Sequence, residues 1–157
     1  MDTLAIEHEI FIDAPIEVVW RTVTEPDQIV QWFTDLAELD LEPGGDGILT
    51  WEDKATTHAM TSKLVVQTVE PPTRFSFRWN HPDGVSPADG NSMLVEFTLA
   101  AAGPERTYLR VVETGLETID WPDAEKGRYA DEHRHGWSVH LGSLVSLLGD
   151  RSRPGPR

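Results

Sequence analysis

The segment that most constrains the fold is a long amphipathic stretch near the C-terminus, residues 123–149. On a helical wheel, where successive residues lie a little over a quarter-turn apart, one side of this stretch is apolar and the other is polar. Such a helix gains most of its stability by packing its apolar side on another element. Nearly every segment before it has the pattern of a short strand, so the sequence predicts one long helix packed on a sheet. Together with Trp137, the apolar side contains Tyr129, His133, His140, Leu141, Leu144, Val145 and Leu148.

Six segments upstream of this helix have the alternating pattern of strands with one buried face. Turns rich in glycine and proline separate them, at the spacing of antiparallel hairpins. Two short helices are predicted after the first strand, because Pro15 and Pro26 each suit a first helical turn. Strands at hairpin spacing with helices at both ends predict an antiparallel α+β fold. The expected strands are residues 4–12, 48–52, 58–69, 74–80, 93–99 and 106–114.

The composition narrows the class of protein. The 157 residues include 27 acidic and 13 basic side chains, for a net charge of −14. An acidic surface repels nucleic-acid phosphates and anionic lipid headgroups, so neither nucleic acid nor a membrane is an expected partner. There is no cysteine, which excludes disulfides and thiolate sites. With no signal peptide or membrane span in sight, we expect a cytoplasmic protein with one domain at 1–150 and a disordered basic tail at 151–157.

Several motifs, taken in order, resemble one known family. They are IDAPIEVVW at 12–20, QWF at 31–33, VEPP at 69–72, the strand at 107–115, and Gly136-Trp137 followed by the leucines of the long helix. The chain resembles the activator-of-Hsp90-ATPase-like family of the START and pollen-allergen (SRPBCC) superfamily over about residues 4–149. The resemblance implies a helix-grip fold, in which a curved antiparallel sheet wraps around a long C-terminal helix with two short helices after the first strand. It also implies a cavity between helix and sheet, which in relatives holds lipids, polyketides or other apolar molecules, and it implies no universal catalytic motif.

The aromatic residues of the chain favour a pocket independently of this resemblance. Large flat rings offer apolar contact area at low entropic cost, which suits ligand sites. Rings also fill ordinary cores, and the pattern does not separate the two roles for any single ring. The apolar pocket candidates are Trp32, Phe33, Trp51, Met60, Phe77, Trp79, Phe97, Trp137 and Leu144.

Three polar candidates face the same interior. Glu113 shares the parity of Leu109 and Val111 on the last strand, and burying an unpaired polar group costs about 1–3 kcal/mol. Glu113 is therefore either a pocket carboxylate that orients a ligand or acts as a base with raised pKa, or a rim residue paired with arginine or water. His133 and His140 lie on the apolar side of the helix, either touching a ligand or bonded to neighbours in the core. They stand about 10.5 Å apart along the helix axis, too far to share one ion, so no metal or other cofactor is expected.

Three functions remain open. The first is binding of an apolar or aromatic small molecule in the cavity. The second is an enzyme of the cyclase or hydrolase type with Glu113 or a pocket histidine as acid–base, which is less favoured because no nucleophile–base pair is visible. The third is modulation of the Hsp90 ATPase, the least favoured, because the eukaryotic proteins that name the family carry an additional domain for which this chain has no room. A homodimer is compatible with the sequence, as is a kink of the long helix at Gly127.

Overall fold

The computed structural model describes residues 5–53, 58–80, 85–88 and 90–152. These residues form one seven-stranded antiparallel sheet in the order β1-β7-β6-β5-β4-β3-β2. The strands are β1 (Ile6–Ile12), β2 (Leu36–Leu39), β3 (Asp46–Asp53), β4 (His58–Glu70), β5 (Arg74–Trp79), β6 (Met93–Gly103) and β7 (Arg106–Thr114). The helices are α1 (Ile16–Thr24), α2 (Pro26–Ile29), the short 3-10 helix η1 (Leu116–Thr118) and α3 (Asp123–Ser152).

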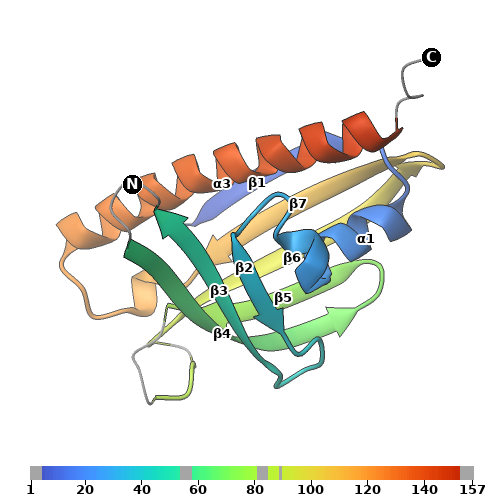
Figure 1. Cartoon of the computed structure of the whole chain (residues 1–157). Coiled ribbons are helices and arrows are strands. Elements are labelled where there is room, and N and C mark those ends of the chain that lie inside the picture. Colours follow the sequence, from blue (N-terminus) through green and yellow to red (C-terminus); the bar gives the residue numbers. More distant parts are fainter. Residues whose placement is uncertain (1–4, 54–57, 81–84, 89, 153–157) are drawn as a thin grey trace.

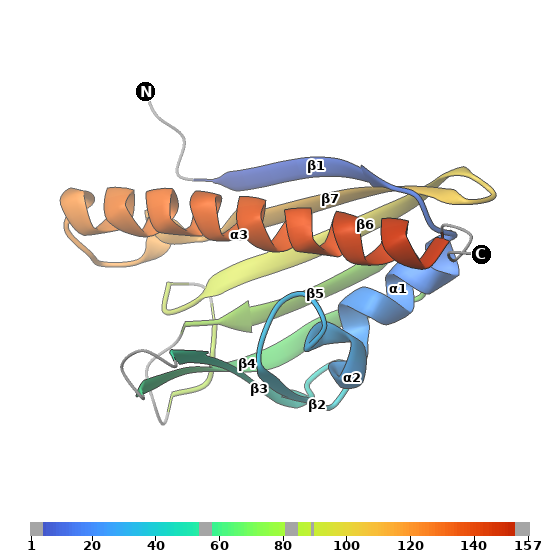
Figure 2. The same cartoon turned by 45° about the horizontal axis from the view of Figure 1, so that its top comes forward.

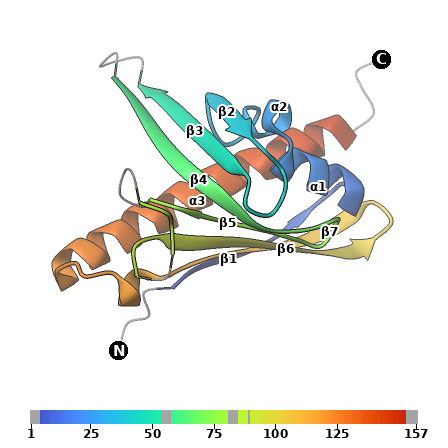
Figure 3. The same cartoon turned by 90° about the horizontal axis from the view of Figure 1, so that it is seen from below.

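Helix α3 crosses the concave face of the sheet, as the helix-grip prediction requires (Figure 1). In Figure 2, α1 and α2 lie near the C-terminal end of α3, so that end of the fold is covered by helices from both halves of the chain. The view from below in Figure 3 shows β3 and β4 turning away from the plane of β5, β6 and β7. A bulge between Val66 and Thr68 lies in β4, and bulges increase the bend and twist of a strand.

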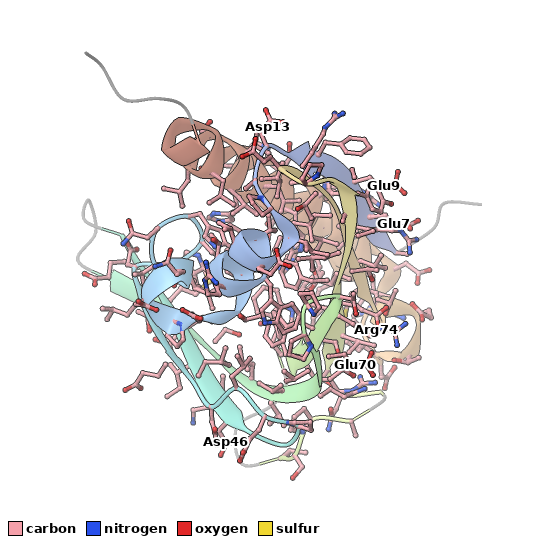
Figure 4. All side chains as sticks on the ribbon, turned by 90° about the vertical axis from the view of Figure 1, so that its right-hand side faces the viewer. Glu7, Glu9, Asp13, Asp46, Glu70 and Arg74 are labelled. Atoms are coloured by element: carbon pink, nitrogen blue, oxygen red, sulfur yellow. The ribbon has the colours of Figure 1, made fainter. Side chains whose placement is uncertain are left out.

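The apolar side predicted for the long helix is confirmed. Trp137, Leu141, Leu144 and Leu148 are at most 3% exposed, and the helix continues without interruption through Gly127. Strand β6 alternates as expected, with every second residue from Met93 to Leu99 buried. Charged residues of the opposite face, such as Glu7, Glu9 and Arg74, lie on the outside of the molecule (Figure 4).

The structure differs from the sequence prediction at several boundaries. Strand β2 was not predicted, because Leu36-Ala37-Glu38-Leu39 is too short to show a period and lies at a sheet edge. Strand β6 runs to Gly103, beyond the predicted end at Leu99. Helix α3 includes two residues of the segment expected to be disordered. The remaining tail at 153–157 lies outside the described residues, as do the predicted connection at 54–57 and parts of the predicted loop at 81–91. Within the described residues, no helix is both long and apolar enough to span a bilayer.

One buried hydrogen bond fixes the point where the chain leaves β1 for α1. The Thr107 hydroxyl donates to the Ala14 carbonyl oxygen at 2.7 Å, and both residues are buried. We expect Thr107→Val to lower the free energy of unfolding by about 1–3 kcal/mol, because the Ala14 carbonyl then lacks its partner. Thr98→Val, a half-buried residue on the outer face of β6, should change stability by about 0.5 kcal/mol or less. If urea unfolding showed the same loss of unfolding free energy in both variants, the stabilising role of the Thr107–Ala14 hydrogen bond would be contradicted.

Candidate functional site

A pocket of about 420 Å³ lies between residues 132–140 of α3 and strands β3 to β5, toward one end of the fold. It is open to solvent on one side. Helix α3 supplies one wall, β3 to β5 supply the other, and Phe33 closes the inner end. The lining residues are Phe33, Trp51, Met60, Ser62, Trp79, Asn80, Glu132, His133, Gly136, Trp137 and His140.

The interior at the other end of the fold is filled by side chains. A void of about 10 Å³ remains there, room for about one water molecule. Trp32, Phe77 and Phe97 line that void rather than the pocket, and Leu144 is fully buried and lines neither. The cavity predicted between helix and sheet is therefore confined to one end.

The apolar walls of the pocket are rings that pack on one another. Phe33 stacks on Trp137 with centroids 5.1 Å apart and meets Trp51 edge-on at 5.4 Å. The ring centroids of Trp79 and Trp137 are 5.9 Å apart. The Trp51 indole also donates to the Phe33 carbonyl oxygen at 2.8 Å, which fixes the ring against the inner end. These contacts give the pocket flat, preformed aromatic sides.

A chain of hydrogen bonds leads from the pocket wall into the core. The Ser62 hydroxyl donates to Asn80 Oδ1 at 3.2 Å, and Asn80 Nδ2 donates to the Tyr129 hydroxyl at 2.7 Å. The Tyr129 hydroxyl in turn donates to Glu113 Oε2 at 2.6 Å. Asn80 has a φ of 60°, a left-handed conformation that asparagine tolerates better than most residues. The chain ends on a carboxylate with no exposed surface.

Four donors surround the Glu113 carboxylate, two on each oxygen. Oε2 accepts from Trp79 Nε1 at 2.9 Å and from the Tyr129 hydroxyl, and Oε1 accepts from Trp137 Nε1 at 3.0 Å and from His133 Nδ1 at 2.9 Å. An ionised carboxylate offers about four acceptor positions, so its capacity is filled. One donor comes from β5 and three come from α3, at positions spaced four residues apart. The carboxylate therefore ties the helix to the sheet.

These donors favour the ionised form of Glu113. Burial alone raises the pKa of Glu113, but hydrogen bonds from His133, Tyr129 and Trp137, with the charge His133 carries when protonated, together bring it below its ordinary value. Burial and the charge of Glu113 raise the pKa of Tyr129, so its hydroxyl keeps the proton it donates. A lowered pKa contradicts one of the alternatives for Glu113, that of a base with raised pKa. Its pairing with arginine or water at a rim is also wrong, because the carboxylate lies behind the pocket wall.

The two candidate histidines both line the pocket, and they have different hydrogen-bond partners. His133 is held by Glu113 at Nδ1 and stacks on Tyr129 with centroids 3.8 Å apart, and its side chain is 24% exposed. Burial lowers the pKa of His140, partly offset by a backbone hydrogen bond with Trp32, so this imidazole is neutral at neutral pH. No group of three histidine or acidic side chains among the described residues is arranged to hold a metal ion.

The pocket combines predicted residues with four that the sequence did not indicate. Phe33, Trp51, Trp79 and Trp137 form its apolar sides, and His133 and His140 lie on its helical wall. Met60 is 69% exposed and lies at the mouth rather than inside, because it sits near the tip of the β3–β4 hairpin. The residues that sequence reasoning missed are Ser62, Asn80, Glu132 and Gly136. Only Gly136, a glycine inside an amphipathic helix, carried a signal that could have been used.

Replacing Glu113 by its isosteric amide tests the role of the four donors. A glutamine has one acceptor oxygen, so two of the four donors would face an amide nitrogen. We expect Glu113→Gln to lower the free energy of unfolding by about 2–5 kcal/mol in urea unfolding. Glu96→Gln, in a part-exposed pair with Arg74, should cost about 0.5 kcal/mol or less. A tolerated Glu113→Gln substitution would contradict the four-donor arrangement.

The lowered pKa of Glu113 also predicts a pH dependence. Because the pKa is lower in the folded than in the unfolded state, the ionised carboxylate stabilises the fold above the unfolded pKa, and this contribution is lost as the pH falls. Tyr129→Phe removes one donor to the Glu113 carboxylate and should lower the free energy of unfolding. The difference in this free energy between the variant and the wild type should shrink between about pH 5 and pH 2, because the carboxylate then protonates. Thr98→Val, the variant on the outer face of β6 described above, is the control, for which the difference should stay constant. The measurement is urea unfolding at several pH values.

Comparisons with known proteins agree with this architecture. The family model described as "Activator of Hsp90 ATPase homolog 1-like protein" matches residues 13–149. A search of curated proteins finds no match. The structure of protein MLL2253 from Mesorhizobium loti is 23% identical and covers 96% of this chain and 99% of its own, with a TM-score of 0.74.

Two further solved structures share this fold. DynU16, a protein of the dynemicin biosynthetic locus, is 26% identical with a TM-score of 0.72, covering 94% of this chain and 48% of its own. Aha1 from Colwellia psychrerythraea, whose solution structure is a dimer, is 18% identical with a TM-score of 0.66, covering 93% and 96%. Likeness at such identities shows a shared fold, whereas the family match extends over most of the sequence. The chain belongs to the family of activator of Hsp90 ATPase homolog 1-like proteins.

Proposed function

We propose that this protein binds an apolar, planar small molecule in the pocket between α3 and the sheet. The observation that carries the proposal is an open pocket of about 420 Å³ with preformed aromatic sides. Ligand sites have volumes of roughly 300–1,000 Å³ and are lined mainly by apolar and aromatic side chains, with a few polar groups. This pocket has that size and that composition.

The arrangement of the rings favours a flat ligand. Trp137 and Phe33 are stacked with an interplanar angle of 24°, and the Trp79 ring is tilted 35° from Trp137. A planar molecule can lie against such surfaces with offset stacking, worth about 0.5–1.5 kcal/mol per ring pair beyond area burial. Met60 at the mouth is unbranched and adaptable, so it can close over ligands of different outline.

Polar and charged groups restrict the ligand further. Ser62, Asn80, His133 and His140 place hydrogen-bonding atoms in the wall, so the ligand is expected to carry polar groups at its edge. The exposed carboxylate of Glu132 and the net charge of −14 oppose the entry of an anion. A neutral aromatic molecule meets both conditions.

The comparison with DynU16 supports a small-molecule role. That protein belongs to a biosynthetic locus, and it shares the fold with this chain over 94% of the chain. Since the chain covers 48% of DynU16, the likeness extends to one part of that protein. The pocket in this chain, rather than the likeness, carries the proposal.

Gly136 offers a direct test, because it lines the pocket and a Cβ placed there meets no atom within 4 Å. Gly136→Leu should fill the pocket while leaving the fold intact, and a helical glycine replaced by leucine should gain up to about 1 kcal/mol of stability. We expect the affinity for the neutral dye Nile red, measured by its fluorescence and by tryptophan quenching, to fall at least about tenfold.

Gly142→Leu is the matched control. Gly142 lies in the same helix, is exposed, and also has no atom within 4 Å of an added Cβ. This variant should bind Nile red with wild-type affinity. Absence of dye binding by the wild type, or wild-type affinity in Gly136→Leu, would refute binding in this pocket.

A further inference from the structure

We propose that His133 is the proton-accepting residue of the pocket, and that the preferred ligand is a planar aromatic molecule with an acidic hydroxyl, a phenol or enol. The inference rests on the proposed binding function and specifies the chemistry of the ligand. It starts from the pairing of His133 with a carboxylate that no solvent reaches.

The partner of His133 determines which ring nitrogen carries a proton. Each oxygen of Glu113 already accepts from a tryptophan N–H, so the carboxylate is the acceptor in its 2.9 Å contact with His133 Nδ1. Nδ1 must therefore be the protonated nitrogen. In a neutral imidazole with a proton on Nδ1, Nε2 keeps its lone pair and is an acceptor.

The orientation of the ring turns this acceptor toward the pocket. Nδ1 points to the buried carboxylate, and one face of the ring is covered by Tyr129 at a centroid distance of 3.8 Å. Nε2 lies on the edge of the ring away from Glu113 and has no hydrogen-bond partner among the described residues. Because His133 lines the pocket with 24% of its side chain exposed, this edge is the part a ligand can reach.

An aromatic hydroxyl suits this acceptor better than other groups. The hydroxyl can donate to Nε2 while its ring lies against Trp79, whose centroid is 5.8 Å from that of His133, or against Trp137. If the acidity of the ligand approaches that of an imidazolium ion, its O–H bond breaks, an N–H bond forms at Nε2, and the electron pair stays on the ligand oxygen. The imidazolium then lies between two anions, Glu113 and the phenolate, and the total charge of the site is unchanged.

The other titratable groups around His133 are consistent with this role. On α3, Tyr129 keeps its proton, His140 is neutral, and Glu132 at the exposed edge of the wall favours an imidazolium but opposes a phenolate. The described wall residues of β3 to β5 are uncharged. Glu113, from β7, is the positioning residue, because it acts on the ligand through His133. His140 is the competing base and is tested separately.

The experiment compares umbelliferone, a hydroxycoumarin whose neutral and ionised forms absorb at different wavelengths, with its methyl ether, which has no ionisable hydroxyl. The variant is His133→Asn, because the asparagine amide can still donate to Glu113 from the place of Nδ1 but has no atom at Nε2. His140→Asn tests the competing base, and His135→Asn, at an exposed position of the same helix, is the matched control that should keep both the affinity and the shift. The readouts are the affinity, and the pKa of bound umbelliferone from its absorbance as a function of pH.

We expect wild-type protein to lower the pKa of bound umbelliferone by about one unit. His133→Asn should lose that shift and bind umbelliferone about tenfold more weakly, with the affinity for the methyl ether changed about twofold or less. His140→Asn should keep the shift. In nitrogen-15 NMR of the ligand-free wild type, His133 should carry a proton on Nδ1 alone. Binding of umbelliferone should add a second proton on Nε2, whereas binding of the methyl ether should add none.

Two results would overturn the inference and leave the proposed function standing. One is equal binding of umbelliferone and its ether with no change in the pKa of the bound hydroxyl. The other is a shift that His140→Asn abolishes and His133→Asn preserves. If neither compound binds, the proposed function fails and the inference fails with it. The NMR measurement uses the wild type, so it tests proton transfer to His133 even if His133→Asn does not fold.

Discussion

The carboxylate of Glu113 is the interaction on which the rest of this structure depends. A buried ionised group is tolerated only when its acceptor positions are filled, and here the donors come from β5 and from α3. If α3 moved off the sheet, three of the four hydrogen bonds would be lost. Beyond the packing of its leucines, the position of α3, and with it one wall of the pocket, is therefore tied to the need to satisfy a single charge.

The pocket exists because the two ends of the interior are filled differently. Near the C-terminal end of α3, leucines of the helix and rings such as Phe75 and Phe97 leave almost no space, and α1 and α2 cover that end. Toward the start of α3 the helix contributes Gly136, which has no side chain, and histidines rather than leucines. The same helix is thus a core element along its second half and a pocket wall along its first.

Much of the fold, and the face on which each site residue lies, could be predicted from the sequence, because strands repeat every two residues and helices every 3.6. Strand alternation correctly placed Glu113 on the inner face beside Leu109 and Val111, and the helical wheel correctly grouped Tyr129, His133 and Trp137 on the apolar side of α3. The sequence did not show that these residues converge, because parity fixes the face of a residue but not its distance from residues on other elements.

The differences between expectation and structure have the same origin. Phe77, Phe97 and Leu144 face inward as predicted, yet they lie at the filled end, a position along the strand or helix that no local pattern encodes. The direction of the Glu113 pKa shift stayed open because the pattern showed the burial of this residue and not the number of its donors. Asn80 was missed because its left-handed backbone follows from the way β5 ends, not from any repeat.

The complete set of hydrogen-bond donors around Glu113 also limits how this chain can evolve. Replacing the acid alone leaves several donors without acceptors, and replacing one aromatic donor leaves the charge with fewer hydrogen bonds, so each single step across the cluster is expected to lower stability. A lineage could leave this arrangement by exchanging the carboxylate and its partners together for apolar side chains of similar volume. Glu113, Trp79, Tyr129, His133 and Trp137 are therefore expected to be inherited, or lost, as a set.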